Sequence, residues 1–200
     1  MNPEHGSPEW WEARKGLPTA SRFSDMCAAG SGITAMRYAS EKVAESLGAE
    51  LPSFENEDMR WGITYEPDAI EAYQARKFTL VKPGTLHIAE IQGMKFGATP
   101  DGLVGADGII EVKCPKTTTH LMTFVNGFPS DYALQVQGEL MATGRTWCDF
   151  ISYDPRCKGA ELYIERVYRD ETKEATILKG LAKHYQLREQ MTTAINKCKS

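Results

Sequence analysis

Apolar and polar residues alternate along the middle of the chain, from about Thr79 to Lys113. Side chains of a strand point to opposite faces in turn, so this alternation predicts short β-strands joined by Gly-containing connections. The predicted strands are Thr79–Lys82, Leu86–Ile91, Lys95–Ala98, Leu103–Val104 and Ile109–Lys113. We expect them to form one antiparallel run.

Helical periodicity dominates on both sides of these strands. The predicted helices are Pro8–Gly16, Arg22–Ala29 (capped within Thr19-Ala20-Ser21), Thr34–Leu47, Asn56–Lys77, Thr117–Asn126, Ser130–Ala142 and Asp170–Lys197. Gly30-Ser31-Gly32 should end the second helix, and Pro67 should kink or restart the fourth. Trp147–Tyr153 and Glu161–Arg166 alternate as further strands.

The order of these elements predicts an α/β fold with a central mixed, mainly antiparallel sheet flanked by helices. Residues 1–200 are expected to form a single domain, because the length suits one core and no repeat or linker interrupts the chain. An apolar stripe on the last helix is expected to face the core or another subunit. Its members are Ile177, Leu181, Tyr185, Met191 and Ile195.

Composition narrows the class of protein. Hydrophobic residues make up 42% and charged residues 25%, which is ordinary for a globular chain. No apolar run approaches 18 residues and no signal peptide is evident, so we expect a cytoplasmic protein. Five scattered cysteines lack a C-x-x-C pair, which disfavours disulfides and a zinc site.

A net charge of −4 argues against a protein that coats nucleic acid. It does not exclude an enzyme that draws DNA into a locally basic channel. Such a channel could be lined by Arg14, Lys15, Lys113 and Lys116.

Thr99-Pro100-Asp101-Gly102 and Ile110-Glu111-Val112-Lys113 carry the most informative chemistry. Asp101 lies in a turn-prone sequence, and Ala106-Asp107-Gly108 turns the chain back, so pairing of the flanking strands would place Asp101 beside Glu111. Glu111 and Lys113 would share one strand face. Two neighbouring carboxylates suit a hard cation such as Mg²⁺, and a lysine beside them could hold a water. The same pattern also fits an ordinary turn and the solvent side of an edge strand.

Three other places could contribute to a site. Glu66 follows Gly62 on a helix, where a glycine indicates a close approach. Gln135 and Gln137 lie on a later helix and could orient a water or contact phosphate. Arg14, with Thr19 and Ser21 shortly after it, could form a phosphate clamp. Each also has a plainer interpretation as a surface residue.

Taken together, these blocks resemble the lambda-type exonucleases of phage recombination, in the YqaJ-like branch of the nuclease superfamily named for its Pro-Asp…(Asp/Glu)-x-Lys motif. The resemblance is carried, in order along the chain, by Trp11-x-x-Arg14-x-Gly16 with Thr19-Ala20-Ser21, Trp61-Gly62-x-x-Tyr65-Glu66, Pro100-Asp101, Glu111-Val112-Lys113-Cys114-Pro115, Gln135-Val136-Gln137 and Tyr153-Asp154-Pro155-Arg156. This collinear order is more specific than any single block.

The resemblance implies a restriction-endonuclease-like core and roles for individual residues. Asp101, Glu111 and the backbone carbonyl of Val112 would hold two Mg²⁺ ions, with Mn²⁺ as a substitute, and Lys113 would activate the attacking water. Glu66 and Gln135 would complete the catalytic site. The residues implied for the 5′-phosphate and DNA are Arg14, Ser21, Thr99 and Gln137; Thr99 replaces the serine of the lambda enzyme.

The implied activity is Mg²⁺-dependent 5′-to-3′ digestion of one strand of double-stranded DNA, in a phage or prophage setting within a bacterial cell. The resemblance further implies a ring-shaped homotrimer and a single-strand annealing protein as partner. Two alternatives stay open from the residues themselves: a structure-selective endonuclease or resolvase with the same metal core, and a non-catalytic DNA-end-binding scaffold.

Overall fold

The computed structural model describes residues 3, 6–29, 32–52 and 56–199. Its helices and strands follow the predicted order, most of them within two residues of the predicted bounds. They are α1 (Pro8–Arg14), η1 (Ala20–Arg22), α2 (Phe23–Met26), α3 (Ile33–Ser46), α4 (Glu57–Lys77), β1 (Val81–Pro83), β2 (His87–Ile91), β3 (Met94–Ala98), β4 (Gly102–Val104), β5 (Gly108–Lys113), α5 (Thr117–Asn126), η2 (Ser130–Tyr132), α6 (Ala133–Thr143), β6 (Trp147–Tyr153), β7 (Leu162–Tyr168) and α7 (Glu171–Lys199).

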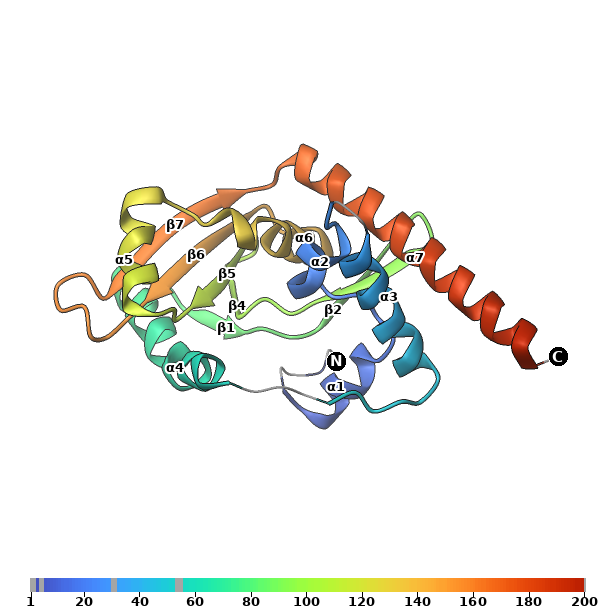
Figure 1. Cartoon of the computed structure of the whole chain (residues 1–200). Helices are drawn as coiled ribbons and strands as arrows, with labels where there is room; N and C mark the ends of the chain where they lie inside the picture. Colours follow the sequence, from blue (N-terminus) through green and yellow to red (C-terminus); the bar gives the residue numbers. More distant parts are fainter. Residues whose placement is uncertain (1–2, 4–5, 30–31, 53–55, 200) are drawn as a thin grey trace.

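A five-stranded mixed sheet forms the centre of the fold, in the order β1-β4-β5-β6-β7 (Figure 1). Strands β5 and β6 run parallel, with Glu111 opposite Phe150, and the other neighbours are antiparallel. Helices α5 and α6 form the connection between β5 and β6, since parallel neighbours need a crossover. The predicted fold class, a mainly antiparallel sheet flanked by helices, is confirmed.

The expectation of a single antiparallel run is wrong, because β2 and β3 form a separate hairpin. Strand β3 pairs with β2, and β4 takes the place beside β5. Pro100 lies between β3 and β4 and has no N–H to donate, so it cannot continue a hydrogen-bonded ladder. Strand β3 also contacts the segment that precedes η1, because the N–H of Gly97 donates to the carbonyl of Pro18 (2.9 Å).

Helices cover both faces of the sheet around β5 and β6 (Figure 1). On one face Tyr73 of α4 packs with Ile110, Val112 and Ile151. On the other face Val136 and Leu140 of α6 pack with Ile109 and Cys148. Strand β5 is therefore buried on both sides, and the side chains that alternate along it enter two different environments.

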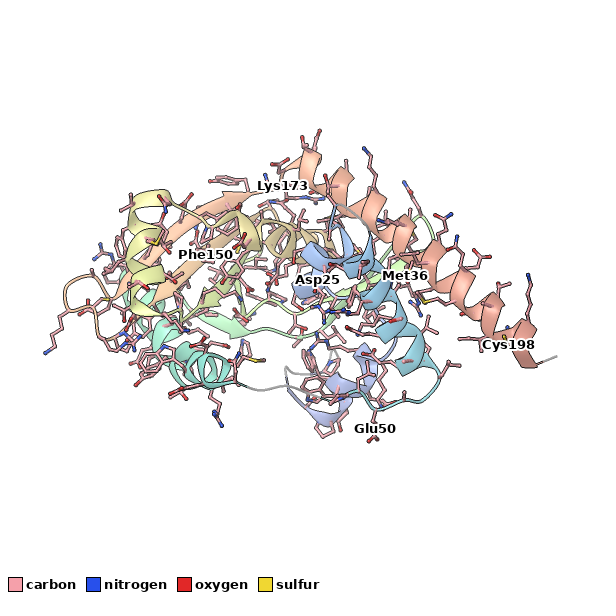
Figure 2. All side chains as sticks on the ribbon, viewed as in Figure 1. Asp25, Met36, Glu50, Phe150, Lys173 and Cys198 are labelled. Atoms are coloured by element: carbon pink, nitrogen blue, oxygen red, sulfur yellow. The ribbon has the colours of Figure 1, made fainter. Side chains whose placement is uncertain are left out.

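Helix α7 packs along α3, and its C-terminal part extends past the other elements (Figure 1). Ile177 and Leu181 are fully buried in a core with Phe23 and Phe96, which confirms the core role of the first part of the stripe. Figure 2 labels Phe150 within the sheet layer and Cys198 near the C-terminal tip of α7, far from the core.

Two predicted helix interruptions differ in the structure. Helix α4 is continuous through Pro67, which is exposed, so the expected restart does not occur. The second predicted helix is shorter, ending at Met26. Of the expected break, Gly30 and Ser31 lie outside the described residues, whereas Gly32 has a φ of 76° and directly precedes α3.

None of the described helices combines the length and apolar character needed to cross a membrane. The five cysteines are free thiols.

Candidate active site

The β4–β5 hairpin fixes Asp101 against β5. The N–H of Asp101 donates to the carbonyl of Ile110 (3.2 Å), and the N–H of Val112 donates to Asp101 Oδ2 (2.6 Å). The chain at Gly84 approaches so closely that a Cβ there would lie 1.6 Å from the carbonyl oxygen of Pro100. The predicted turn at Asp107-Gly108 therefore does bring Asp101 beside Glu111.

Strand β5 separates apolar from reactive side chains, as its alternation predicts. Ile110 and Val112 enter the core under α4, while Glu111 and Lys113 lie on the α6 side. Glu111 is only 1% exposed and forms an ion pair with the ammonium group of Lys113. The ring of Tyr132 lies 5.0 Å from Lys113 Nζ, so an aromatic face adds to the environment of this cation.

Helix α6 supplies an amide that joins two acids. Gln135 Nε2 donates to Glu111 Oε1 (2.6 Å) and to Glu139 Oε1 (3.0 Å). Glu139 was not predicted as a site residue. The available signal was its spacing, because residues four apart on a helix share a face, and Glu139 follows Gln135 by that interval.

Gln137 does not join this site, and its predicted role as a DNA contact is not supported by its position. Its buried amide donates to the carbonyl of Tyr168 (2.9 Å) and accepts from the N–H of Asp170 (2.9 Å). A residue and the second one after it on a helix are rotated by about 200° around the helix axis, so Gln135 and Gln137 lie on nearly opposite sides of α6. Gln137 ties α6 to the end of β7 and the start of α7.

Glu66 comes to the same place from the other face of the sheet. It lines one cavity with Asp101, Glu111 and Lys113. Burial and the charge of Glu111 raise the pKa of the Glu66 carboxyl, which Lys113 partly offsets.

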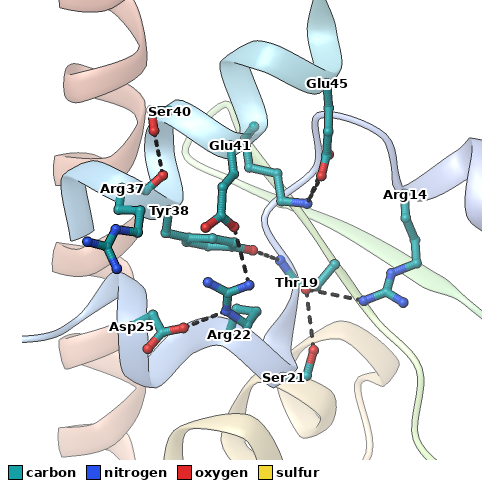
Figure 3. A network of polar contacts seen from close by, with 11 residues as sticks. Arg14, Thr19, Ser21, Arg22, Asp25, Arg37, Tyr38, Ser40, Glu41 and Glu45 are labelled. Atoms are coloured by element: carbon teal, nitrogen blue, oxygen red, sulfur yellow. Dashed lines mark hydrogen bonds and ion pairs between the residues drawn. The ribbon is translucent and has the colours of Figure 1, made fainter. Parts of the chain in front are cut away.

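Arg14, Thr19 and Ser21 also line this cavity, and Figure 3 shows the polar contacts that join them. Arg14 Nη2 donates to Thr19 Oγ1 (3.4 Å), which lies 3.4 Å from Ser21 Oγ. The guanidinium stacks 3.8 Å above the ring of Trp10, whose indole N–H donates to Thr99 Oγ1 (2.9 Å). Thr99 therefore holds α1, and with it Arg14, against the site. Burial lowers the pKa of Arg14.

The cavity has a volume of about 380 Å³ and brings together nearly all of the predicted site residues. Its predicted members are Arg14, Ser21, Glu66, Thr99, Asp101, Glu111, Val112, Lys113 and Gln135. Two predicted channel lysines do not line it. Lys15 pairs with Glu12 (2.6 Å) and Lys116 with Asp58 (3.1 Å), both on the surface.

Acidic groups in the cavity repel one another. Burial and the neighbouring charge of Glu111 raise the pKa of Asp101 and of Glu139 well above their ordinary values. Burial alone would lower the pKa of Lys113, but the charges of Glu111 and Asp101 outweigh it and raise that pKa. The lysine is thus held as a cation.

The donor set suits a hard cation that keeps part of its water shell. Glu111 Oε2 and Glu139 Oε2 are buried without a hydrogen-bond partner. In the described part of the chain, no three His, Cys, Asp or Glu side chains form a ready-made metal cage. Mg²⁺ does not require one, since it usually takes one or two carboxylates and retains several waters.

Comparison with known proteins gives the family. Residues 9–146 match the YqaJ-like viral recombinase domain. The fold is similar to LHK-Exo, an alkaline exonuclease from Laribacter hongkongensis, in its crystal structure with dAMP (34% identity, TM-score 0.86, 96% of this chain and 98% of that chain) and in a second crystal structure (34%, 0.81, 96% and 100%).

A phage-related exonuclease from Haemophilus somnus 129PT has the same fold at 14% identity (TM-score 0.70, 90% of this chain and 96% of that chain). No curated protein matches. The match over residues 9–146 and the 34% identity across 96% of the sequence show that the chain belongs to the family of YqaJ-like viral recombinases.

Proposed function

We propose that the protein is a Mg²⁺-dependent 5′-to-3′ exonuclease of double-stranded DNA that releases 5′-mononucleotides and leaves a 3′ single-stranded tail. The observation that carries the proposal is the single cavity in which Asp101, Glu111 and Lys113 meet Arg14. The lining of this cavity combines groups for phosphodiester hydrolysis with a cation suited to a terminal phosphate. The related alkaline exonuclease was crystallised with dAMP, a deoxynucleoside monophosphate like the proposed product.

Asp101, Glu111 and the backbone carbonyl of Val112 are the proposed ligands of two Mg²⁺ ions, with Mn²⁺ as a substitute. When bound, such ions lower the pKa of the attacking water and neutralise charge on the leaving oxygen. Glu66 lies beside these ligands and would act through a water or by holding a neighbouring group.

Lys113 would act as a charge, not as a base. Because its pKa is raised, it stays protonated at neutral pH and can donate to the attacking water and to a non-bridging phosphate oxygen. Such a preset charge favours the transition state, in which negative charge grows on the phosphoryl oxygens. Gln135 keeps Glu111 oriented for the same step.

Arg14 would give the reaction its polarity. A guanidinium matches the geometry of a terminal phosphate, and the hydroxyl groups of Thr19 and Ser21 add donors beside it. A 5′-phosphate held there would place the neighbouring phosphodiester toward Asp101. This position favours action at ends over a structure-selective endonuclease or resolvase, and the complete acidic site disfavours a non-catalytic scaffold.

The assembly and the biological setting belong to the same proposal. Family membership supports a homotrimeric ring around the DNA, a single-strand annealing protein as partner, and a role in recombination of phage or prophage DNA within a bacterial cell. Light scattering at several protein concentrations would test the trimer; a mass equal to one chain throughout would contradict it.

The decisive experiment digests a linear duplex labelled at one 5′ end or one 3′ end, with Mg²⁺ or with chelator. We expect rapid early release of the 5′ label in Mg²⁺ only, faster from a 5′-phosphate than from a 5′-hydroxyl. A covalently closed circle is the control and should survive. Cutting of the circle would favour the endonuclease, and binding without any release would favour the scaffold.

A further inference from the structure

Glu139 is a buried acid for which the proposed reaction has no assigned role. It lies on α6, is 1% exposed and lines the cavity that contains Asp101 and Glu111. Its Oε1 accepts a hydrogen bond from Gln135 Nε2 (3.0 Å), and the same nitrogen donates to Glu111 Oε1 (2.6 Å). Both N–H groups of the amide are therefore used to join Glu139 to Glu111.

Each of the two joined carboxylates keeps one buried oxygen without a partner, Glu111 Oε2 and Glu139 Oε2. A buried acceptor without a donor is costly, and two such acceptors on repelling acids are costlier still. The other buried acids in the described part of the chain, Asp149 and Asp154, have hydrogen-bond partners for both carboxylate oxygens. Asp154, for example, accepts from Thr117 (2.6 Å) and twice from the side chain of Arg156 (2.8 and 2.9 Å). In the pair in the cavity, the two Oε2 atoms lack a positively charged or donating partner, and Lys113, which pairs with Glu111 Oε1, offsets only one of the two negative charges.

A divalent cation supplies what the pair lacks. An anion would be repelled, and a neutral donor would leave the surplus negative charge uncompensated. Hard cations prefer carboxylate oxygens, and buried charges in proteins are paired or coordinate metals.

We propose that Glu139 is a further carboxylate of the divalent-cation site, joined to Glu111 through Gln135 and acting on the ion directly or through a water. The inference rests on the proposed function, from which it takes the cation, and adds a contributor from α6 to the ligands of the β4–β5 hairpin. Partners that surround metal ligands typically contribute 10- to 100-fold to metal affinity.

The test is calorimetric titration of Mg²⁺, and of Mn²⁺ with detection by electron paramagnetic resonance, in the absence of DNA. Glu139→Gln keeps the shape and an acceptor for Gln135 but removes the charge, and we expect about tenfold weaker cation binding. Glu90→Gln is the matched control, because it removes one charge from the exposed β2–β3 hairpin. Equal affinity of Glu139→Gln and Glu90→Gln would overturn the proposal.

A second pair of variants separates charge from shape. Glu139→Asp and Glu139→Asn have the same length, so the aspartate variant should bind the cation more tightly if the charge matters. Equal binding by both would reject the role, even if Glu139→Gln fails to fold.

The outcomes also distinguish this inference from the proposed function. If the unaltered protein binds no divalent cation, the metal-dependent nuclease and the role of Glu139 both fail. If it binds the cation and digests DNA, yet Glu139→Gln binds equally well, only the role of Glu139 fails.

Discussion

Two neighbouring strands of the sheet each carry a buried acid, and the two acids differ in the face they lie on and in their hydrogen-bond partners. Asp149 on β6 is paired in register with Ile110 and lies on the α4 side, whereas Glu111 on β5 lies on the α6 side. Asp149 accepts from Arg166 Nε and Nη2 (2.7 and 2.8 Å) and from the hydroxyl of Tyr73 (2.8 Å). Burial would raise the pKa of Asp149, but these hydrogen bonds outweigh it and lower that pKa.

The acids of the cavity have fewer donors: Glu111 pairs with Lys113, and the one amide of Gln135 donates to both Glu111 and Glu139. Asp101 and Glu139 have raised pKa values, and one oxygen of Glu111 and one of Glu139 have no partner. Burial is similar on the two faces, so burial does not distinguish a structural acid from a reactive one. The distinction is whether the chain itself provides enough compensating charge, because Lys113 is one cation beside several acids.

The largest expected effect is the loss of DNA digestion in Asp101→Asn, which alters an acid of the cavity. Loss of a metal-binding carboxylate removes several kcal/mol of transition-state stabilisation, which corresponds to a decrease of at least about 1000-fold in digestion rate. The measurement is Mg²⁺-dependent release of acid-soluble nucleotides, with retention of DNA binding checked by gel shift. Asp149→Asn is the control and should digest at a normal rate per folded molecule. Substantial Mg²⁺-dependent digestion by Asp101→Asn would remove Asp101 from the metal site.

Asp149→Asn should show its effect on stability instead. The substitution weakens a bidentate charge-assisted contact with Arg166, so we expect a loss of about 2 kcal/mol in the free energy of unfolding. For a domain of this size that is a decrease of about 4–8 °C in melting temperature. Calorimetry would check it, and an unchanged melting temperature would show that the Asp149 contacts add no net stability.

The alternation of Ile109–Lys113 was enough to place Glu111 and Lys113 on one face, and the Pro-Asp-Gly turn was enough to place Asp101 beside them. These are local consequences of strand geometry. The separation of β2–β3 from the main sheet is not local, because it depends on contacts with η1, α6 and α7. Periodicity predicts that a strand exists but not which strand it pairs with.

Glu139 and Gln137 show the same limit at the level of single side chains. Both lie on a largely buried stretch of α6, yet one faces the cavity and the other faces the β7–α7 connection. Asp149 carried a signal that could have been used: it is an ionisable residue within the apolar run Cys148–Ile151. Such a residue predicts a buried partner but does not name it, because Tyr73 and Arg166 are distant in sequence.

Arg14→Ala should affect the choice of DNA end. Removing the guanidinium should lower the ratio of digestion rates on 5′-phosphorylated and 5′-hydroxyl duplexes about tenfold, equivalent to about 1.4 kcal/mol. Arg37→Ala removes an exposed arginine from α3 and is the matched control, with an unchanged ratio expected. If both variants keep the ratio of the unaltered protein, the phosphate has another binding site.

The smallest expected effect is a change in the free energy of unfolding at pH 7. It tests the two environments most sharply, because Asp101→Asn and Asp149→Asn should change this free energy in opposite directions. In chelator, the raised folded-state pKa of Asp101 means that its contribution to stability is present below about pH 4 and is lost as the pH rises toward the folded pKa. Asp101→Asn escapes this loss and should be more stable than the unaltered protein at pH 7, by about 1 kcal/mol, with no gain near pH 3. Asp149 has a lowered pKa, so its contribution is present above about pH 4 and is lost on acidification, and Asp149→Asn should be less stable at pH 7.

Added Mg²⁺ should raise the melting temperature of the unaltered protein and of Asp149→Asn but not that of Asp101→Asn, because only a bound ion stabilises the folded state. Melting curves that shift in the same direction for both variants at pH 7 in chelator would show that the chain compensates Asp101 as fully as it compensates Asp149.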